Sequence, residues 1–126
     1  MENVVKVTSN FYWGKRIFIT GHTGFKGLWL SEILTLFGAE VTGYSLASPT
    51  KEGSELFDRL KLAQKMNSVC GDIRDFDALS RAIKEARPEI VLHLAAQPLV
   101  IESYRDPVGT YMTNMVGTLN LLECIR

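Results

Sequence analysis

The chain has 126 residues, of which 46% are hydrophobic and 22% charged, with 14 basic and 14 acidic side chains and a formal net charge of zero. This length fits one domain that buries a core without metals or disulfides, and the composition excludes a disordered chain. Zero net charge removes the general electrostatic argument for nucleic acid or an anionic membrane as a partner.

Four short apolar runs, each followed by a turn and a helical pattern, predict strands that alternate with helices. This order is typical of an α/β fold, a Rossmann-like doubly wound parallel sheet with helices on both faces. Ligands of such sheets bind beyond the carboxyl ends of the strands, so informative residues should directly follow each strand. The strands are expected at 16–20, 40–45, 67–70 and 90–94, the helices at 28–37, 55–65, 76–87 and 107–125, and a loop at 98–106. Asp75 and Asp106 are expected to cap the last two helices.

The loop after the first strand, residues 20–27, reads TGHTGFKG and spaces its glycines as GxxGxxG. Such glycines allow a tight turn, let the backbone approach a pyrophosphate, and pack the following helix closely on the strand. The N-terminus of that helix offers free N–H groups and a partial positive charge to phosphates. A P-loop is excluded because Lys26 is followed by glycine rather than by serine or threonine. The loop therefore favours a dinucleotide, and the alternative is a turn whose glycines serve packing alone.

Together with three later stretches, this loop resembles the extended short-chain dehydrogenase/reductase family. The later stretches are GDIRDF at 71–76, HLAAQPLV at 93–100 and TNMVGT at 113–118, so the resemblance spans nearly the whole chain. More narrowly, the glycine loop and the AAQPLV run resemble the CDP-glucose 4,6-dehydratases of that family, although Ile101 stands where an arginine is expected. The resemblance implies a hydride cycle on a nucleotide-linked hexose, in which bound NAD oxidises sugar C4, water leaves from C6, and the hydride returns to C6.

The residues expected to bind the cofactor lie in the glycine loop and directly after the second, third and fourth strands. By the resemblance, Asp72 and Ile73 lie at the adenine, while the alternative for Asp72 is a helix cap. Residues 94–96, two of which are the small residues Ala95 and Ala96, pass the ribose and nicotinamide, and Gln97 faces the substrate. The full set is Gly21, His22, Thr23, Gly24, Phe25, Lys26, Gly27, Ser45, Asp72, Ile73, Leu94, Ala95, Ala96 and Gln97.

Four further polar residues have expected roles near this site. His22 is expected to contact phosphate or backbone, and Lys26 lies either near the pyrophosphate or in solvent. His93 sits within an apolar run and is interpreted as a core histidine. By the resemblance, Asn114 steadies the loop on the cofactor side.

The choice between NAD and NADP depends on the end of the second strand. An acidic residue there would bind the ribose hydroxyls and favour NAD, but the chain carries Ser45 at this position. A serine can hydrogen-bond a hydroxyl without repelling a 2′-phosphate, and no arginine follows at once to attract that phosphate. The residues alone leave both cofactors open, and the resemblance implies NAD.

No catalytic residue is assigned, because the tyrosine-based motif YxxxK of the family does not occur in the chain. The positions four residues after Tyr12, Tyr44, Tyr104 and Tyr111 hold Arg16, Ser48, Val108 and Met115. We therefore expect residues 1–126 to form an NAD-binding Rossmann domain that is incomplete at its C-terminal end, lacks the substrate domain and is inactive alone. By the resemblance, the last helix packs against a second copy in a homodimer.

Three other interpretations stay open: a non-catalytic dinucleotide-binding module, a nucleotide-sugar epimerase of the same family, and a pure interaction domain. Cys70 and Cys124 form no CxxC or zinc-ligand spacing, so no metal site is expected. Neither a signal peptide nor an apolar stretch near the ~18 residues of a membrane span is visible. These features favour a cytoplasmic protein without nucleic-acid or membrane partners.

Overall fold

The computed structural model describes residues 10–126, and within them four parallel strands form one sheet in the order β3-β2-β1-β4. The α/β prediction is confirmed, with strands that match the expected ranges except that the fourth ends one residue earlier. They are β1 (Arg16–Thr20), β2 (Glu40–Ser45), β3 (Asn67–Cys70) and β4 (Ile90–His93). The parallel register pairs Thr20 with both Tyr44 and His93, so the carboxyl ends of the central strands meet at one edge.

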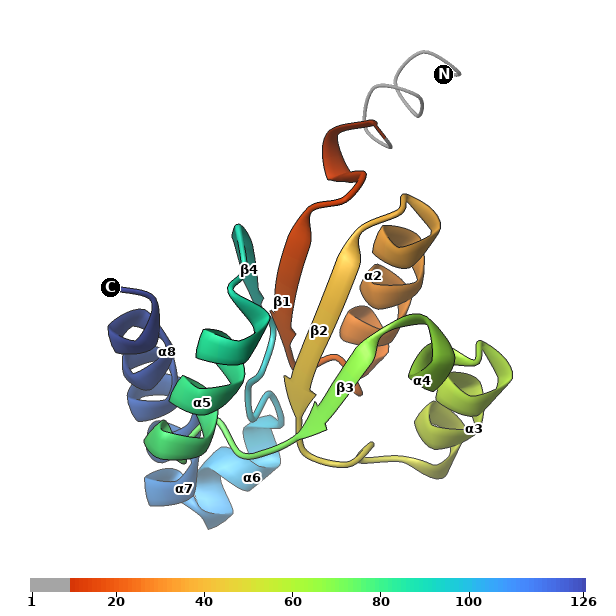
Figure 1. The fold of residues 1–126 in the computed structure, drawn as a ribbon. Helices are drawn as coiled ribbons and strands as arrows, with labels where there is room; N and C mark the ends of the chain where they lie inside the picture. Colours follow the sequence, from red (N-terminus) through yellow and green to blue (C-terminus); the bar gives the residue numbers. More distant parts are fainter. Residues whose placement is uncertain (1–9) are drawn as a thin grey trace.

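Helices cover both faces of the sheet (Figure 1), as the crossovers of a doubly wound sheet require. One face carries α2, α3 and α4, and the other carries α5 and α8, which pack against each other. The helical segments are α2 (Phe25–Leu36), α3 (Lys51–Arg59), α4 (Leu62–Lys65), α5 (Phe76–Ala86), α6 (Val100–Arg105), α7 (Pro107–Tyr111), the π-helical turn η1 (Met112–Val116) and α8 (Gly117–Ile125).

Alternate residues of β1 divide the core of the described residues into two layers. Ile17 and Ile19 pack beneath α2 with Leu28 and Leu34. Phe18 points the other way and packs with side chains of β2, α5 and α8. This period-two alternation on a strand buried on both faces explains why the run is continuously apolar.

Two predicted caps are confirmed by their hydrogen bonds. The Asp75 carboxylate accepts from the backbone N–H of Ala78 at 3.0 Å and begins α5. The Asp106 carboxylate accepts from the N–H of Gly109 at 2.8 Å, with Pro107 in the first turn of α7. Both contacts satisfy an N–H group that the helix itself leaves without a partner.

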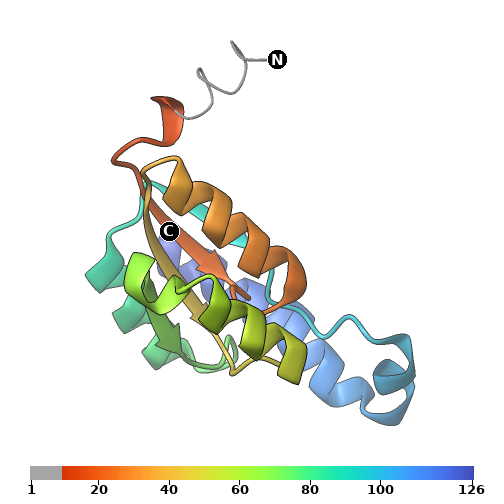
Figure 2. The same ribbon diagram turned by 90° about the vertical axis from the view of Figure 1, so that its right-hand side faces the viewer.

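Three helix predictions and one loop prediction were wrong in detail. The first helix begins at Phe25 rather than 28, and the single helix expected at 55–65 is two helices separated at Lys61, whose φ is +53°. The last helix contains a π-helical turn, and the loop expected at 98–106 contains α6. In Figure 2 the light-blue α6 lies far from the sheet. This helix was not predicted because its apolar side chains do not form the stripe that a helix packed on a core shows. They stay exposed instead, with exposed fractions of 71% for Val100 and 83% for Tyr104.

Candidate functional site

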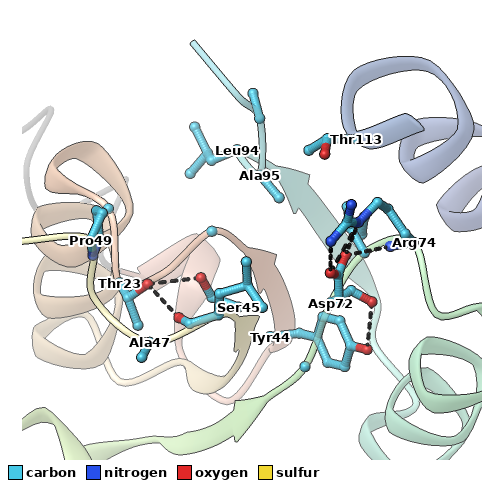
Figure 3. A pocket seen from close by; sticks show the side chains of 16 residues that line it. Thr23, Tyr44, Ser45, Ala47, Pro49, Asp72, Arg74, Leu94, Ala95 and Thr113 are labelled. Atoms are coloured by element: carbon cyan, nitrogen blue, oxygen red, sulfur yellow. Dashed lines mark hydrogen bonds and ion pairs between the residues drawn. The ribbon is translucent and has the colours of Figure 1, made fainter. Parts of the chain in front are cut away.

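A cavity of about 230 Å³ lies at the carboxyl ends of the strands (Figure 3), where ligands of open α/β sheets bind. Five segments far apart in the sequence meet there: the glycine loop, the segments that follow β2 and β3, the loop after β4, and η1, which contributes Thr113. The residues that line it are Gly21, Thr23, Gly24, Tyr44, Ser45, Leu46, Ala47, Pro49, Gly71, Asp72, Ile73, Arg74, Leu94, Ala95, Ala96 and Thr113.

The glycine loop takes its shape from a close contact with the loop after β4. Gly21 has φ of +78°, in the left-handed region that favours glycine. A Cβ atom on Gly21 would lie 2.7 Å from the backbone nitrogen of Ala95, and one on Gly27 would overlap the carbonyl oxygen of Gly21. Because these two positions carry no side chain, α2 and the backbone of Leu94 and Ala95 can pack closely against the same turn.

Gly24 lines the cavity and is also the N-cap of α2, where no side chain among residues 10–126 accepts a hydrogen bond from the helix. The first-turn N–H groups of a 12-residue helix thus stay free of side-chain acceptors. Such groups, together with the helix dipole, bind anions such as phosphate.

Two hydroxyl groups meet at the end of β2, and their hydrogen bonds have a defined direction. The Thr23 hydroxyl donates its single proton to the carbonyl oxygen of Leu46 at 2.9 Å. It must therefore accept the proton of the Ser45 hydroxyl, which lies 2.8 Å away. Ser45 is left with only lone pairs for a group in the cavity, so it acts as a hydrogen-bond acceptor there.

Asp72 and Arg74 are the charged side chains that line the cavity among the described residues. The Asp72 carboxylate accepts from the Arg74 guanidinium, at 2.6 Å from Nη2, and from the Arg74 backbone N–H at 2.9 Å. These bonds hold the pKa of Asp72 below its ordinary value, the side-chain hydrogen bond from Arg74 contributing most. Asp72 precedes α5 without capping it, since that position is taken by Asp75.

The ring of Tyr44 fills the space beneath Gly71, and its hydroxyl donates to the backbone carbonyl of Asp72 at 3.0 Å. Burial raises the pKa of Tyr44, and the nearby carboxylates of Asp75 and Asp72 add to this shift. Tyr44 therefore supports the chain after β3 as a neutral phenol.

The loop after β4 is tied to the π-helical turn by a pair of hydrogen bonds. The amide side chain of Asn114 accepts from the N–H of Gln97 at 2.8 Å and donates to the carbonyl of Gln97 at 3.1 Å. Asn114 thus holds this loop, which is the contact expected of it. The side chain of Gln97 bonds back to Leu99 and Thr110 rather than lining the cavity.

His22 is expected to contact phosphate or backbone, and the structure places its side chain in the protein interior, away from the cavity lining. It is 1% exposed, packs on Gly43, and its Nε2 lies 2.7 Å from the hydroxyl of Ser68. Its Nδ1 atom has no hydrogen-bond partner within the described residues. Burial lowers the pKa of His22 to about 4, so the ring is neutral at pH 7.

Of the fourteen predicted residues, nine line the cavity and five do not: His22, Phe25, Lys26, Gly27 and Gln97. The side chains of Phe25 and Lys26 are exposed, at the start of α2. Seven lining residues were not predicted. Six of them lie within four residues of Ser45 or Asp72 in the sequence, and this closeness is the signal that could have found them. The seventh, Thr113, is brought in by η1 from a distant part of the chain. The seven are Tyr44, Leu46, Ala47, Pro49, Gly71, Arg74 and Thr113.

Comparison with known proteins places this chain in a family. The profile of the GDP-mannose 4,6 dehydratase family matches residues 18–126. The chain belongs to this family.

Within residues 10–126, no helix is long and apolar enough to cross a membrane, and no group of three or more His, Cys, Asp or Glu residues could hold a metal ion.

Relatives of this dehydratase-family chain include the CDP-glucose 4,6-dehydratase of Salmonella typhimurium, which is 53% identical over 120 residues, 95% of this chain and 33% of that protein. The solved structure of the epimerase Mth375 from Methanothermobacter thermautotrophicus superposes with a TM-score of 0.82 at 30% identity, covering 96% of this chain and 34% of that one. The Thermus thermophilus UDP-glucose 4-epimerase complex with NAD gives a TM-score of 0.74 at 35% identity, over 86% and 33% of the two chains. The chain thus spans about a third of the length of these relatives.

Proposed function

We propose that this chain is the N-terminal, cofactor-binding part of a nucleotide-sugar 4,6-dehydratase that converts CDP-glucose into CDP-4-keto-6-deoxyglucose. The 53% identity to the Salmonella typhimurium CDP-glucose 4,6-dehydratase supports this substrate. The observation that carries the proposal is the cavity in which the glycine loop, Ser45, Asp72 and residues 94–96 meet. This is the place and the chemistry that a dinucleotide requires.

The residues present fit a nicotinamide dinucleotide. The N-terminus of α2 offers N–H groups for a pyrophosphate, with Gly24 removing side-chain bulk at the cavity wall. In this proposal, Asp72 and Ile73 hold the adenine and Ser45 holds its ribose. The small side chains of Ala95 and Ala96 leave room for the second ribose. The Thermus thermophilus epimerase, whose solved structure is a complex with NAD, supports the same class of cofactor.

NAD rather than NADP is supported by the direction of the hydrogen bonds at Ser45. Because the Ser45 proton is directed to Thr23, the free lone pairs of Ser45 suit a ribose hydroxyl, which is a donor. A 2′-phosphate is an acceptor and would need a cation. The guanidinium at the cavity wall, Arg74, is already bound by Asp72.

The chemistry supplied by bound NAD is the reversible acceptance of a hydride. This chain's own residues bind and orient the cofactor: the glycine loop positions the phosphates, and the Asn114–Gln97 bonds hold the loop on the nicotinamide side. The base that takes the C4 hydroxyl proton is absent from these residues, because the chain contains no YxxxK motif. We therefore expect no dehydratase activity from the chain alone.

We also propose that α7, η1 and α8 pack against a second copy in the complete enzyme. The apolar side chains along these segments are exposed in the isolated chain, where they would favour self-association. They include Val108, Tyr111, Met115, Leu119 and Leu122, which are 56–71% exposed.

A chimera tests the function. The matching first third of the Salmonella typhimurium enzyme is replaced by this chain, and NAD binding is measured by calorimetry and product formation by mass spectrometry. We expect CDP-4-keto-6-deoxyglucose from the chimera, and none from this chain or from the remaining two thirds alone. A folded chimera that binds NAD but does not dehydrate CDP-glucose would contradict the proposal.

The second candidate is a nucleotide-sugar epimerase, favoured by the epimerase structures that share this fold at 30% and 35% identity. The same chimera distinguishes it, because an epimerase retains the C6 hydroxyl and leaves the mass of the substrate unchanged. A third possibility, a binding module without chemistry, predicts that the native protein in its source cells has the 14.1 kDa mass of this chain.

A further inference from the structure

His93 lies at the end of β4 and connects three parts of the molecule. Its Nδ1 atom lies 2.6 Å from the hydroxyl of Thr20, the last residue of β1. Its Nε2 atom lies 2.9 Å from the hydroxyl of Thr118 on α8. The same Thr20 hydroxyl oxygen accepts from the backbone N–H groups of Leu94 and Ala95, at 3.1 and 3.2 Å.

The partners decide which ring nitrogen of His93 carries the proton. The Thr20 oxygen already accepts two N–H bonds, so its single proton is available for His93, and Nδ1 must be the acceptor. The proton of the neutral ring then lies on Nε2 and is donated to Thr118. The Thr118 hydroxyl in turn donates to the backbone carbonyl of Asn114 at 2.6 Å, so each donor in the chain has an acceptor.

This chain of hydrogen bonds ends on the backbone that lines the cavity. Leu94 and Ala95 pass against Gly21 so closely that a Cβ there would lie 2.7 Å from the Ala95 nitrogen. At the other end of the loop, the side chain of Asn114 accepts a hydrogen bond from the N–H of Gln97, and the backbone carbonyl of Asn114 accepts from the Thr118 hydroxyl. Both ends of the cavity loop are therefore held by one network that passes through His93.

We propose that His93 is a positioning residue of the cavity, which orients the Thr20 hydroxyl so that it receives the Leu94 and Ala95 amides. This inference rests on the proposed function, because the loop that His93 positions is the proposed wall of the dinucleotide site. His93 does not touch the cavity itself; it acts through Thr20. Burial lowers the pKa of His93, which keeps the ring in the neutral form that the relay requires.

The test compares Thr20→Val, which removes the hydroxyl at nearly constant shape, with Thr20→Ser, which keeps it. A matched control is Thr42→Val, which removes a strand hydroxyl that lies outside this network. We expect ¹⁵N NMR of the wild-type imidazole of His93 to show a protonated Nε2 and an unprotonated Nδ1. With NAD as the probe, calorimetry should show binding about tenfold weaker in Thr20→Val, because the Ala95 amide loses its acceptor while the Leu94 amide keeps the Thr20 carbonyl. Binding should stay within about twofold of wild type in Thr20→Ser and Thr42→Val.

Hydrogen exchange separates this inference from the proposed function. In Thr20→Val the Ala95 amide should exchange about tenfold faster than in Thr20→Ser, with or without NAD, whereas the Leu94 amide keeps the backbone carbonyl of Thr20 as its acceptor. A protonated Nδ1 in the wild type, or equal exchange at the Ala95 amide in Thr20→Val and Thr20→Ser, would overturn the inference. If wild-type protein does not bind NAD, the proposed cofactor site fails, and the imidazole spectrum and the exchange rates still decide whether His93 positions the loop.

Discussion

Replacing Gly21 by alanine tests whether the turn and the cavity loop need each other. Two costs add at this position. An L-residue at φ of +78° costs about 1–2 kcal/mol in the left-handed region. The new Cβ would also lie 2.7 Å from the backbone nitrogen of Ala95, and forcing extra volume into such a contact costs about 1–3 kcal/mol. The lower entropy of the unfolded alanine chain offsets about 0.4–1 kcal/mol of this, so the free energy of unfolding should fall by about 1–4 kcal/mol.

Gly14 provides the matched control, because its φ is +70° and nothing lies within 4 Å of a Cβ built on it. Gly14→Ala carries the backbone cost alone, reduced by the lower entropy of the unfolded alanine chain, and should lower stability by about 1 kcal/mol. Thermal unfolding followed by circular dichroism measures both variants, with a Tm loss of roughly 3–5 °C per kcal/mol for a domain of this size. If Gly21→Ala loses no more stability than Gly14→Ala, the packing of Ala95 against the turn is not what requires glycine.

Three further predictions concern single side chains. Burial lowers the pKa of His22 to about 4, so between pH 6.5 and 4 this histidine is protonated in the unfolded chain but not in the folded protein. The free energy of unfolding should therefore fall by up to about 3 kcal/mol as the pH drops from 6.5 to 4. Denaturation at several pH values checks this, and an equal slope in His22→Gln would refute it. Ser45→Asp should raise the preference for NAD over NADP at least tenfold in calorimetric titrations, since a carboxylate repels a 2′-phosphate; unchanged preference would place the ribose elsewhere. Asp75→Ala should lower the free energy of unfolding by about 1 kcal/mol through loss of the α5 cap, while Asp77→Ala, which caps nothing in the described residues, should change it less.

Much of the fold was predictable because its signals are local. The apolar run of β1, the glycine spacing after it, and the Asp75 and Asp106 caps each depend on residues within a few positions of one another. The alternation of strands and helices then implies a parallel sheet whose carboxyl ends share one edge. That argument placed Ser45, Asp72 and residues 94–96 at a common site, where the structure finds them lining one cavity.

The tertiary structure alone decided which side chains of those segments face the cavity. His22 lies within the glycine loop, yet its ring turns inward to Ser68, 46 residues away, because Gly43 leaves space for it. Thr113 reaches the cavity through a π-helical turn, which the spacing of apolar residues along the sequence does not predict. The roles of Thr20 and His93 also depend on partners more than 70 residues apart. Spacing along the chain determines periodicity, caps and turns, whereas the orientation of a side chain depends on the volume and hydrogen-bonding groups that distant segments bring to it.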